Sequence, residues 1–339
     1  MNDNEIAGAL GTAEPNVNTE AALARFRDRV RDEGAAPVER SARRRLPSRW
    51  LRGLAAAAGV VLVASTLALS GVADTILQIF EPKSVVVVPL TQSDLNYLGQ
   101  QCAGLDLQQC MGAYGTFEWT TPPSPKEVSS RAAAAAAAGF GVLAPTTLPA
   151  SVTGNPRYGV INRSSATFTF SADATKQAAS RINRTPPPMP ANIDGSKLFI
   201  TGGPAVVQLW GAPQGGQAPT GSLHDVPTLV VGQAKAPTIS SDGVTVEQLR
   251  SYMLAQPGIS PQLAAAIRAI GDPSSTLPVP VPAEIAVSHP VTVQGVQGVF
   301  IGDNTGIASA VIWQKDGMMF EVIGSLTESD ALAIANSMR

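Results

Sequence analysis

One uncharged stretch constrains this chain more than any other feature. Residues 54–72 read LAAAAGVVLVASTLALSGV, with Arg52 before them and Asp74 after them. Nineteen helical residues at ~1.5 Å each span roughly 28 Å, about the thickness of a hydrocarbon core. We therefore expect residues 54–73 to form a single transmembrane helix.

Two other interpretations of this stretch stay open. It could be the apolar part of a cleaved signal peptide, with the small residues Gly71 and Ala73 at the cut. The region before it, at more than fifty residues, is long for a signal peptide. It could also be a buried helix of a soluble protein, although polar residues normally interrupt such a run.

Arginines on one side of the stretch predict its orientation. They crowd the N-terminal flank, and no acidic residue follows Glu39 there. The positive-inside rule places such residues in the cytoplasm. We expect a single-pass protein of the cell membrane, with residues 1–53 cytoplasmic and residues 74–339 extracytoplasmic. The arginines that set this topology are Arg43, Arg44, Arg45, Arg49 and Arg52.

The head, residues 1–53, contains one short amphipathic segment. Residues 19–32 read TEAALARFRDRVRD, in which Leu23, Phe26 and Val30 form one narrow apolar stripe. A helix of this length is marginal in water by itself. The segment therefore either binds a partner through this stripe or serves as a solvated tether. The head has neither Cys nor His, so it cannot form a zinc module.

Composition narrows the classes of partner and cofactor. Only 15% of the 339 residues are charged, and 27 prolines and 31 glycines predict many turns. The mildly acidic body lacks the basic surface that nucleic-acid binding requires. Cys102 and Cys110 are spaced for a small disulfide loop in an oxidising compartment, or are two free thiols. We expect no metal site and no cofactor.

The body is expected to contain strands, helices and stiff connections. A helical continuation is expected at residues 75–80, a juxtamembrane helical region at residues 74–145, and an α+β domain at residues 146–339. The alanine run before Gly139 predicts a helix that begins at Ser124. Further helices begin at Thr245, Ser260 and Thr327, whose side chains can cap them. Expected strands lie at 84–88, 157–162, 167–171, 197–201, 205–210 and 227–236, and residues 277–282 form an extended strap.

The C-terminal piece is the best specified. Three strands, at residues 291–294, 297–301 and 307–315, form a meander, and Asp316-Gly317 predicts a two-residue hairpin turn. The turn pairs Lys315 with Met318, Trp313 with Phe320, and Val311 with Val322. Trp313, Phe320, Val311 and Val322 then share one apolar face, and Gln314 and Glu321 lie on the opposite face.

The sequence lacks the pattern of an enzyme. His224 and His289 lie beside Asp225 and Pro290, and no nucleophile elbow surrounds either histidine. Gly202-Gly203 is a turn signal, and it does not precede a helix as a phosphate-binding loop would. We therefore expect no catalytic residues.

Two segments resemble a known arrangement. VIWQKDGMMFEVIGSLTESDALAIANSM (residues 311–338) and GFGVLAPTTLP (residues 139–149) resemble the C-terminal domain of unknown function in membrane-anchored, anti-sigma-factor-like bacterial proteins. The resemblance implies a head that binds a sigma factor and an outer domain that senses or scaffolds. It also implies a fold similar to the curved half-barrels of envelope lipoprotein-handling proteins.

The expected fold class is therefore α+β: a single transmembrane helix, then an extracytoplasmic domain with a curved antiparallel sheet and packed helices. Two functions are weighed equally. One is a single-pass membrane regulator of the anti-sigma-factor type, which contacts the bilayer and a sigma factor. The other is a membrane-anchored envelope module that binds a lipid, peptide or lipoprotein.

Overall fold

The computed structural model describes residues 76–96, 111–181, 183–211, 228–284, 286–303 and 308–339. The strands are β1 (Leu77–Phe80), β2 (Ser84–Leu90), β3 (Gly115–Thr121), β4 (Pro125–Val128), β5 (Arg157–Ile161), β6 (Ser164–Phe170), β7 (Lys197–Gly202), β8 (Ala205–Trp210), β9 (Leu229–Lys235), β10 (Thr238–Ser241), β11 (Thr276–Pro282), β12 (Ala286–Val293), β13 (Val296–Asp303), β14 (Ser309–Lys315) and β15 (Met318–Gly324). The helices are α7 (Arg131–Ala138), α8 (Ala172–Arg181), α9 (Val246–Leu254), α10 (Pro261–Ala269) and α11 (Glu328–Ser337).

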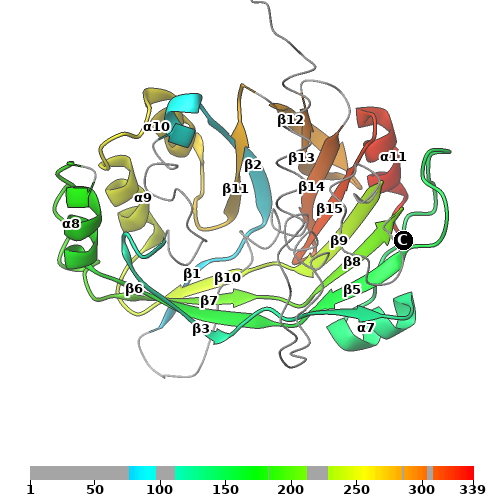
Figure 1. Cartoon of the computed structure of the whole chain (residues 1–339), viewed down its shortest axis with the longest axis horizontal. Helices are drawn as coiled ribbons and strands as arrows, with labels where there is room; N and C mark the ends of the chain where they lie inside the picture. The colour runs from blue at the N-terminus through cyan, green and yellow to red at the C-terminus, as the bar shows by residue number, and fades with distance from the viewer. Residues whose placement is uncertain (1–75, 97–110, 182, 212–227, 285, 304–307) are drawn as a thin grey trace, which may run out of the picture. The chain divides into compact units, whose positions relative to one another are not determined.

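The strands form three sheets (Figure 1). An eight-stranded sheet has the order β12-β13-β14-β15-β9-β8-β5-β4, and a five-stranded sheet has the order β1-β10-β7-β6-β3. Every neighbouring pair in these two sheets is antiparallel. The third sheet pairs β2 with β11 in parallel, and we call this pair the ribbon.

The two larger sheets share a line of strand breaks. The chain passes from one sheet to the other between β3 and β4, β5 and β6, β7 and β8, and β9 and β10. The breaks lie at Pro122-Pro123, Asn162-Arg163, Gly203-Pro204 and Ala236-Pro237. Three of the four contain proline, which cannot donate to a ladder. The strand registers place each break next to the break in the neighbouring strand, so the four breaks form one line.

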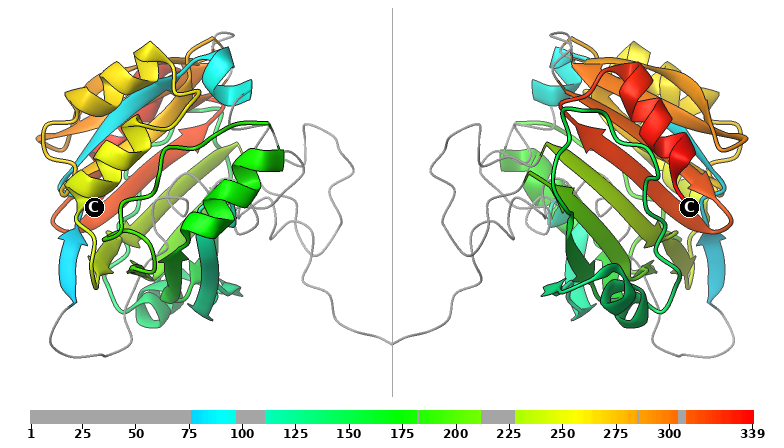
Figure 2. Two further views of the ribbon diagram at one scale, coloured as in Figure 1. Left: turned by 90° about the vertical axis from the view of Figure 1, so that its left-hand side faces the viewer. Right: turned by 90° about the vertical axis from the view of Figure 1, so that its right-hand side faces the viewer.

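The two faces of the eight-stranded sheet have separate cores. On one face, which we call the helix face, Trp313, Phe320, Val311 and Val322 pack against α11. Trp313 and Phe320 stack with ring centroids 5.2 Å apart. Figure 2 shows α11 lying across the last strands of this sheet. The opposite face, which we call the ribbon face, packs against β2 and β11.

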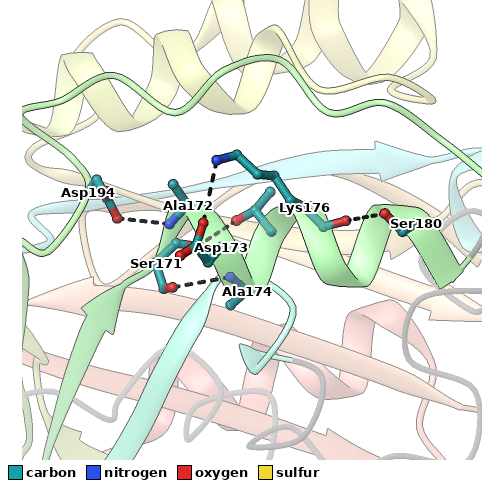
Figure 3. Close-up of polar contacts among 8 residues, drawn as sticks. Ser171, Ala172, Asp173, Ala174, Lys176, Ser180 and Asp194 are labelled. Carbon is teal, nitrogen blue, oxygen red and sulfur yellow. Dashed lines mark hydrogen bonds and ion pairs between the residues drawn. The ribbon is translucent and has the colours of Figure 1, made fainter.

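The five-stranded sheet has its own apolar cluster, which includes Phe168 on β6, Ile200 on β7 and Tyr252 on α9. Helix α8 follows β6 and was not expected from the sequence. Figure 3 shows how it begins: the Ser171 hydroxyl accepts a hydrogen bond from the Ala174 N–H at 3.1 Å, and Asp194 accepts one from the Ala172 N–H at 2.8 Å. Two side chains thus satisfy N–H groups of the first turn.

Short-range expectations in the C-terminal half are confirmed. Thr245 and Gln248 form a reciprocal capping box at α9, and Ser260 caps α10 ahead of Pro261. Lys315 pairs with Met318, Trp313 with Phe320, and Val311 with Val322. Asp316 and Gly317 have φ of 51° and 73°, as their hairpin turn requires.

The expected fold class is wrong. The described residues are mostly β, with 42% strand and 23% helix, and they form several sheets instead of one curved sheet with packed helices. No helix in the described ranges is long and apolar enough to cross a bilayer. The segment expected to do so, residues 54–73, and the head, residues 1–53, lie outside the described residues.

Two expected helices are corrected as well. Residues 77–80, expected to continue a helix, form β1, which pairs with β10. The alanine-rich helix begins at Ser130 instead of Ser124, because residues 125–128 form β4 and pair with β5. Helix propensity in residues 125–128 is overridden by the sheet edge beside them.

Candidate functional site

A buried carboxyl group is the most unusual polar group of the described residues. Glu321 lies in the middle of β15, and 1% of its surface is exposed. Its Oε2 atom has no hydrogen-bond partner within the described ranges. Burial disfavours the ionised form and raises the pKa of Glu321 to about 8. A buried acid without a partner is costly to folding, which makes it a candidate for function.

The absence of a side chain at Gly232 leaves the space that the Glu321 side chain occupies. The two residues are register partners on β9 and β15. A Cβ atom at residue 232 would overlap the carboxylate and the Cγ of Glu321. The Glu321 side chain therefore lies across the β9 backbone instead of standing free of it.

The surroundings of Glu321 on the ribbon face are apolar. Ile312 is its register partner on β14, and Met319 and Ile323 flank it on β15. These three belong to one cluster with Val85 of β2 and Val279 of β11. Glu321 thus lies in the wall of an apolar layer between sheet and ribbon.

The ribbon covers this face through side chains. Within the described part of the chain, its backbone ladder joins β2 only to β11. Contacts run from β2 to β13 and β14 of the larger sheet. Figure 1 shows the ribbon between those strands and the α9–α10 pair.

Prolines limit how far the ribbon can extend into a larger ladder, mainly at the free edge of β11. In a strand, successive residues direct their backbone groups to alternate edges. Ala283 donates to the Leu90 carbonyl at 2.9 Å, so the odd-numbered residues of β11 face β2. The prolines of the ribbon therefore direct their nitrogens, which carry no hydrogen, to its free edges. Within the described ranges no further strand pairs with those edges. These prolines are Pro89, Pro278, Pro280 and Pro282.

Other buried polar side chains have structural roles. Gln233 accepts a hydrogen bond from the Leu143 N–H and donates to the Gly141 carbonyl, both at 2.9 Å. Gln208 donates to the Leu143 carbonyl at 2.6 Å. These amides attach the extended segment after α7 to the eight-stranded sheet, as strand backbone would.

The other end of that segment is tied to the C-terminus. Ala144 and Arg339 exchange two backbone hydrogen bonds of 2.9 and 3.1 Å. Pro145 also forms an isolated β-bridge with Met338, so the segments 139–149 and 311–338 lie side by side in the fold. The family resemblance drawn from these two segments stays a prediction.

The site residues expected from the sequence lie outside the described residues. This holds for the apolar stripe of Leu23, Phe26 and Val30, for the cysteines Cys102 and Cys110, and for the topology residues Arg43, Arg44, Arg45, Arg49 and Arg52. The partner-binding, disulfide and topology roles stay predictions. Among the described residues, no group of three or more His, Cys, Asp or Glu could hold a metal ion.

Of the two histidines considered for catalysis, His224 lies outside the described residues. His289 on β12 contacts Glu328, the first residue of α11, with Nε2 and Oε1 2.8 Å apart. Both side chains are partly exposed, and the contact joins an edge strand to a helix start. The His289–Glu328 contact is therefore a structural contact at the protein surface.

Sequence reasoning placed Glu321 on its face of the sheet but missed its importance. Strand alternation puts Glu321 opposite to Trp313 and Phe320, on a face that reads as polar. The structure buries that face, because the ribbon covers it. No local signal indicates this, since β2 and β11 are about 190 residues apart and each is distant from β15 in the chain.

Comparison with protein-family models found none that matches this chain, and comparison with curated proteins found no match.

Proposed function

We propose that the described domain is a non-catalytic binding module, which takes an apolar ligand onto the ribbon face while the ribbon moves aside. The ribbon is the cover of this site, and Val207, Val230, Ala234, Ile312 and Met319 are its floor. This is the envelope-module function that the sequence suggested.

One observation carries the proposal: the ribbon is attached to the sheet by side chains, and its prolines lie on its free edges. Removing it breaks no backbone ladder of either larger sheet, so the sheets can persist while it opens. The apolar layer then exchanges one apolar neighbour, the ribbon, for another, the ligand.

Hydrogen exchange on the full chain tests this, with N-phenyl-1-naphthylamine as an apolar probe. We expect the amides of β2 and β11 to exchange faster than those of β9 and β14 in the free protein. Probe binding should speed the ribbon amides further, because the ribbon leaves the sheet, and should leave β9 and β14 protected.

A matched pair of variants locates the probe. Ala234→Leu adds volume to the ribbon face, and Ala335→Leu adds the same volume on the helix face, where Ala335 is also buried. Only the first should weaken probe binding. If ribbon and sheet amides exchange together and the probe changes neither, the proposed function is wrong.

A regulatory role is a second candidate, favoured by the stripe of Leu23, Phe26 and Val30 in the head. In this proposal the head binds a sigma factor and the outer domain reports ligand binding to it. The proposed location is the cell membrane with the N-terminus cytoplasmic, which rests on the arginines before residue 54. A pull-down on the full chain tests the head, and Phe26→Asp should abolish retention of a sigma factor.

A further inference from the structure

We propose that Glu321 recognises the cationic nitrogen of a long-chain alkylammonium ligand bound on the ribbon face. This rests on the proposed function and assigns to that site a chemical class of ligand. The ligand has an apolar chain, which replaces the ribbon, and one primary ammonium group, which pairs with the carboxylate.

The position of Glu321 is the first argument. β15 lies between β14 and β9, inside the eight-stranded sheet, and Glu321 is the fourth of its seven residues. Its carboxyl group is fully buried, with Oε2 unpaired within the described ranges. This oxygen makes no hydrogen bond within those ranges, so packing alone does not account for an acid at this position.

The charges around Glu321 are the second argument. The described residues of β2 and β11 include no charged side chain. On the ribbon face, β8, β9 and β14 present Val207, Gly232 and Ile312 nearest to Glu321, and none can carry a charge.

The few charged residues on these strands lie at strand ends. Lys235 ends β9 and is exposed, and Lys315 ends β14 and donates to the Gln294 carbonyl at 3.1 Å. By strand alternation, both lie on the opposite face to Glu321. Asp303 ends β13, four residues beyond Val299, and accepts a hydrogen bond from the Ala308 N–H at 3.2 Å. A cation that pairs with Glu321 must therefore come from outside these strands.

The choice of a cation follows from the low-polarity surroundings. A carboxylate gains more from an ammonium group than from a neutral donor, and the gain is larger where water is excluded. In the free protein Glu321 is protonated at pH 7, because its pKa is near 8. When R–NH₃⁺ binds, the carboxyl O–H bond breaks, the proton leaves to buffer, and the R–NH₃⁺···⁻O₂C pair forms. Binding therefore releases about one proton per ligand.

Isothermal titration of the full chain at pH 7 with decylammonium chloride tests this. Repeating it in buffers of different ionisation enthalpy counts the protons released. The control ligand is 1-decanol, which has the same chain and no charge, and the control protein is Glu321→Gln, which keeps the shape of the side chain. Decylammonium that binds elsewhere on the protein contributes equally to the titrations of the wild type and of the Gln variant. That contribution cancels when the two titrations are compared.

We expect the wild type to bind decylammonium at least tenfold more tightly than the Gln variant does, with about one proton released by the wild type and none by the variant. Decanol should bind both proteins alike. If decylammonium and decanol both bind but neither depends on residue 321, the inference is overturned and the proposed function stands. If neither ligand binds, the proposed function itself fails.

Discussion

Gly232 and Glu321 face each other across the β9–β15 ladder, and the carboxyl group of Glu321 fills the space that a side chain at residue 232 would need. A glycine in a central strand normally weakens the strand, because glycine loses more conformational entropy on folding and has no side chain to pack. Here it permits a buried acid in an apolar layer. The Gly232–Glu321 pair therefore distinguishes the ribbon face from an ordinary hydrophobic core, which contains no buried acid.

Changing Gly232 to Ala should destabilise the fold by about 1–3 kcal/mol, because the new methyl group overlaps the Glu321 side chain. Urea unfolding measures the change. In a Glu321→Ala background the overlapping atoms are absent, so the same substitution should cost clearly less. Equal costs in the two backgrounds would show that the two side chains are not in contact.

Glu321 should make stability depend on pH. Its folded pKa, about 8, exceeds its ordinary value of 4.5, so the native state holds the proton over this window and the unfolded state does not. Stability should therefore fall as pH rises from about 4.5 to 8 and level off above it, by an amount on the order of 4 kcal/mol. Denaturant unfolding from pH 5 to 9 measures it. Glu321→Gln should remove most of this slope, and an unchanged slope would contradict the assignment.

Asp94 should contribute stability of the opposite pH dependence. Burial raises its pKa, but hydrogen bonds from Thr91 and Ser260 outweigh burial and leave the pKa below 3.8. Their contribution is present above pH 3.8 and is lost as pH falls through the lower folded pKa. Asp94→Ala should cost about 1–3 kcal/mol at pH 7, because it leaves the Ser260 and Thr91 donors unpaired. Asp173→Ala, on an exposed helix turn, is the control and should change stability little.

Trp313→Ala should cost roughly 3–5 kcal/mol, because Trp313 is fully buried on the helix face and stacks on Phe320. Thermal and urea unfolding of the full chain measure the loss. Met253→Ala, at an apolar side chain that is 46% exposed, is the control and should stay within about 0.5 kcal/mol. A small loss at residue 313 would mean that α11 does not hold the helix face closed.

The two segments that suggested the family resemblance, residues 139–149 and 311–338, lie next to each other in the fold. Ala144 exchanges two backbone hydrogen bonds with Arg339, and Pro145 forms an isolated bridge with Met338. A hairpin of this kind can serve packing alone, and it identifies no ligand. The candidate site lies on the other face of the sheet.

Sequence alone determined the features that depend on a few neighbouring residues. The turn at Asp316-Gly317, its strand register, and the caps of α9 and α10 all follow from local backbone preferences. Only the tertiary structure decided that β2 and β11 pair, that they cover the face of the sheet bearing Glu321, and that residues 125–128 join a sheet edge. These features arise from contacts between segments far apart in the chain, and burial of a side chain depends on what covers it and not on its neighbours in sequence.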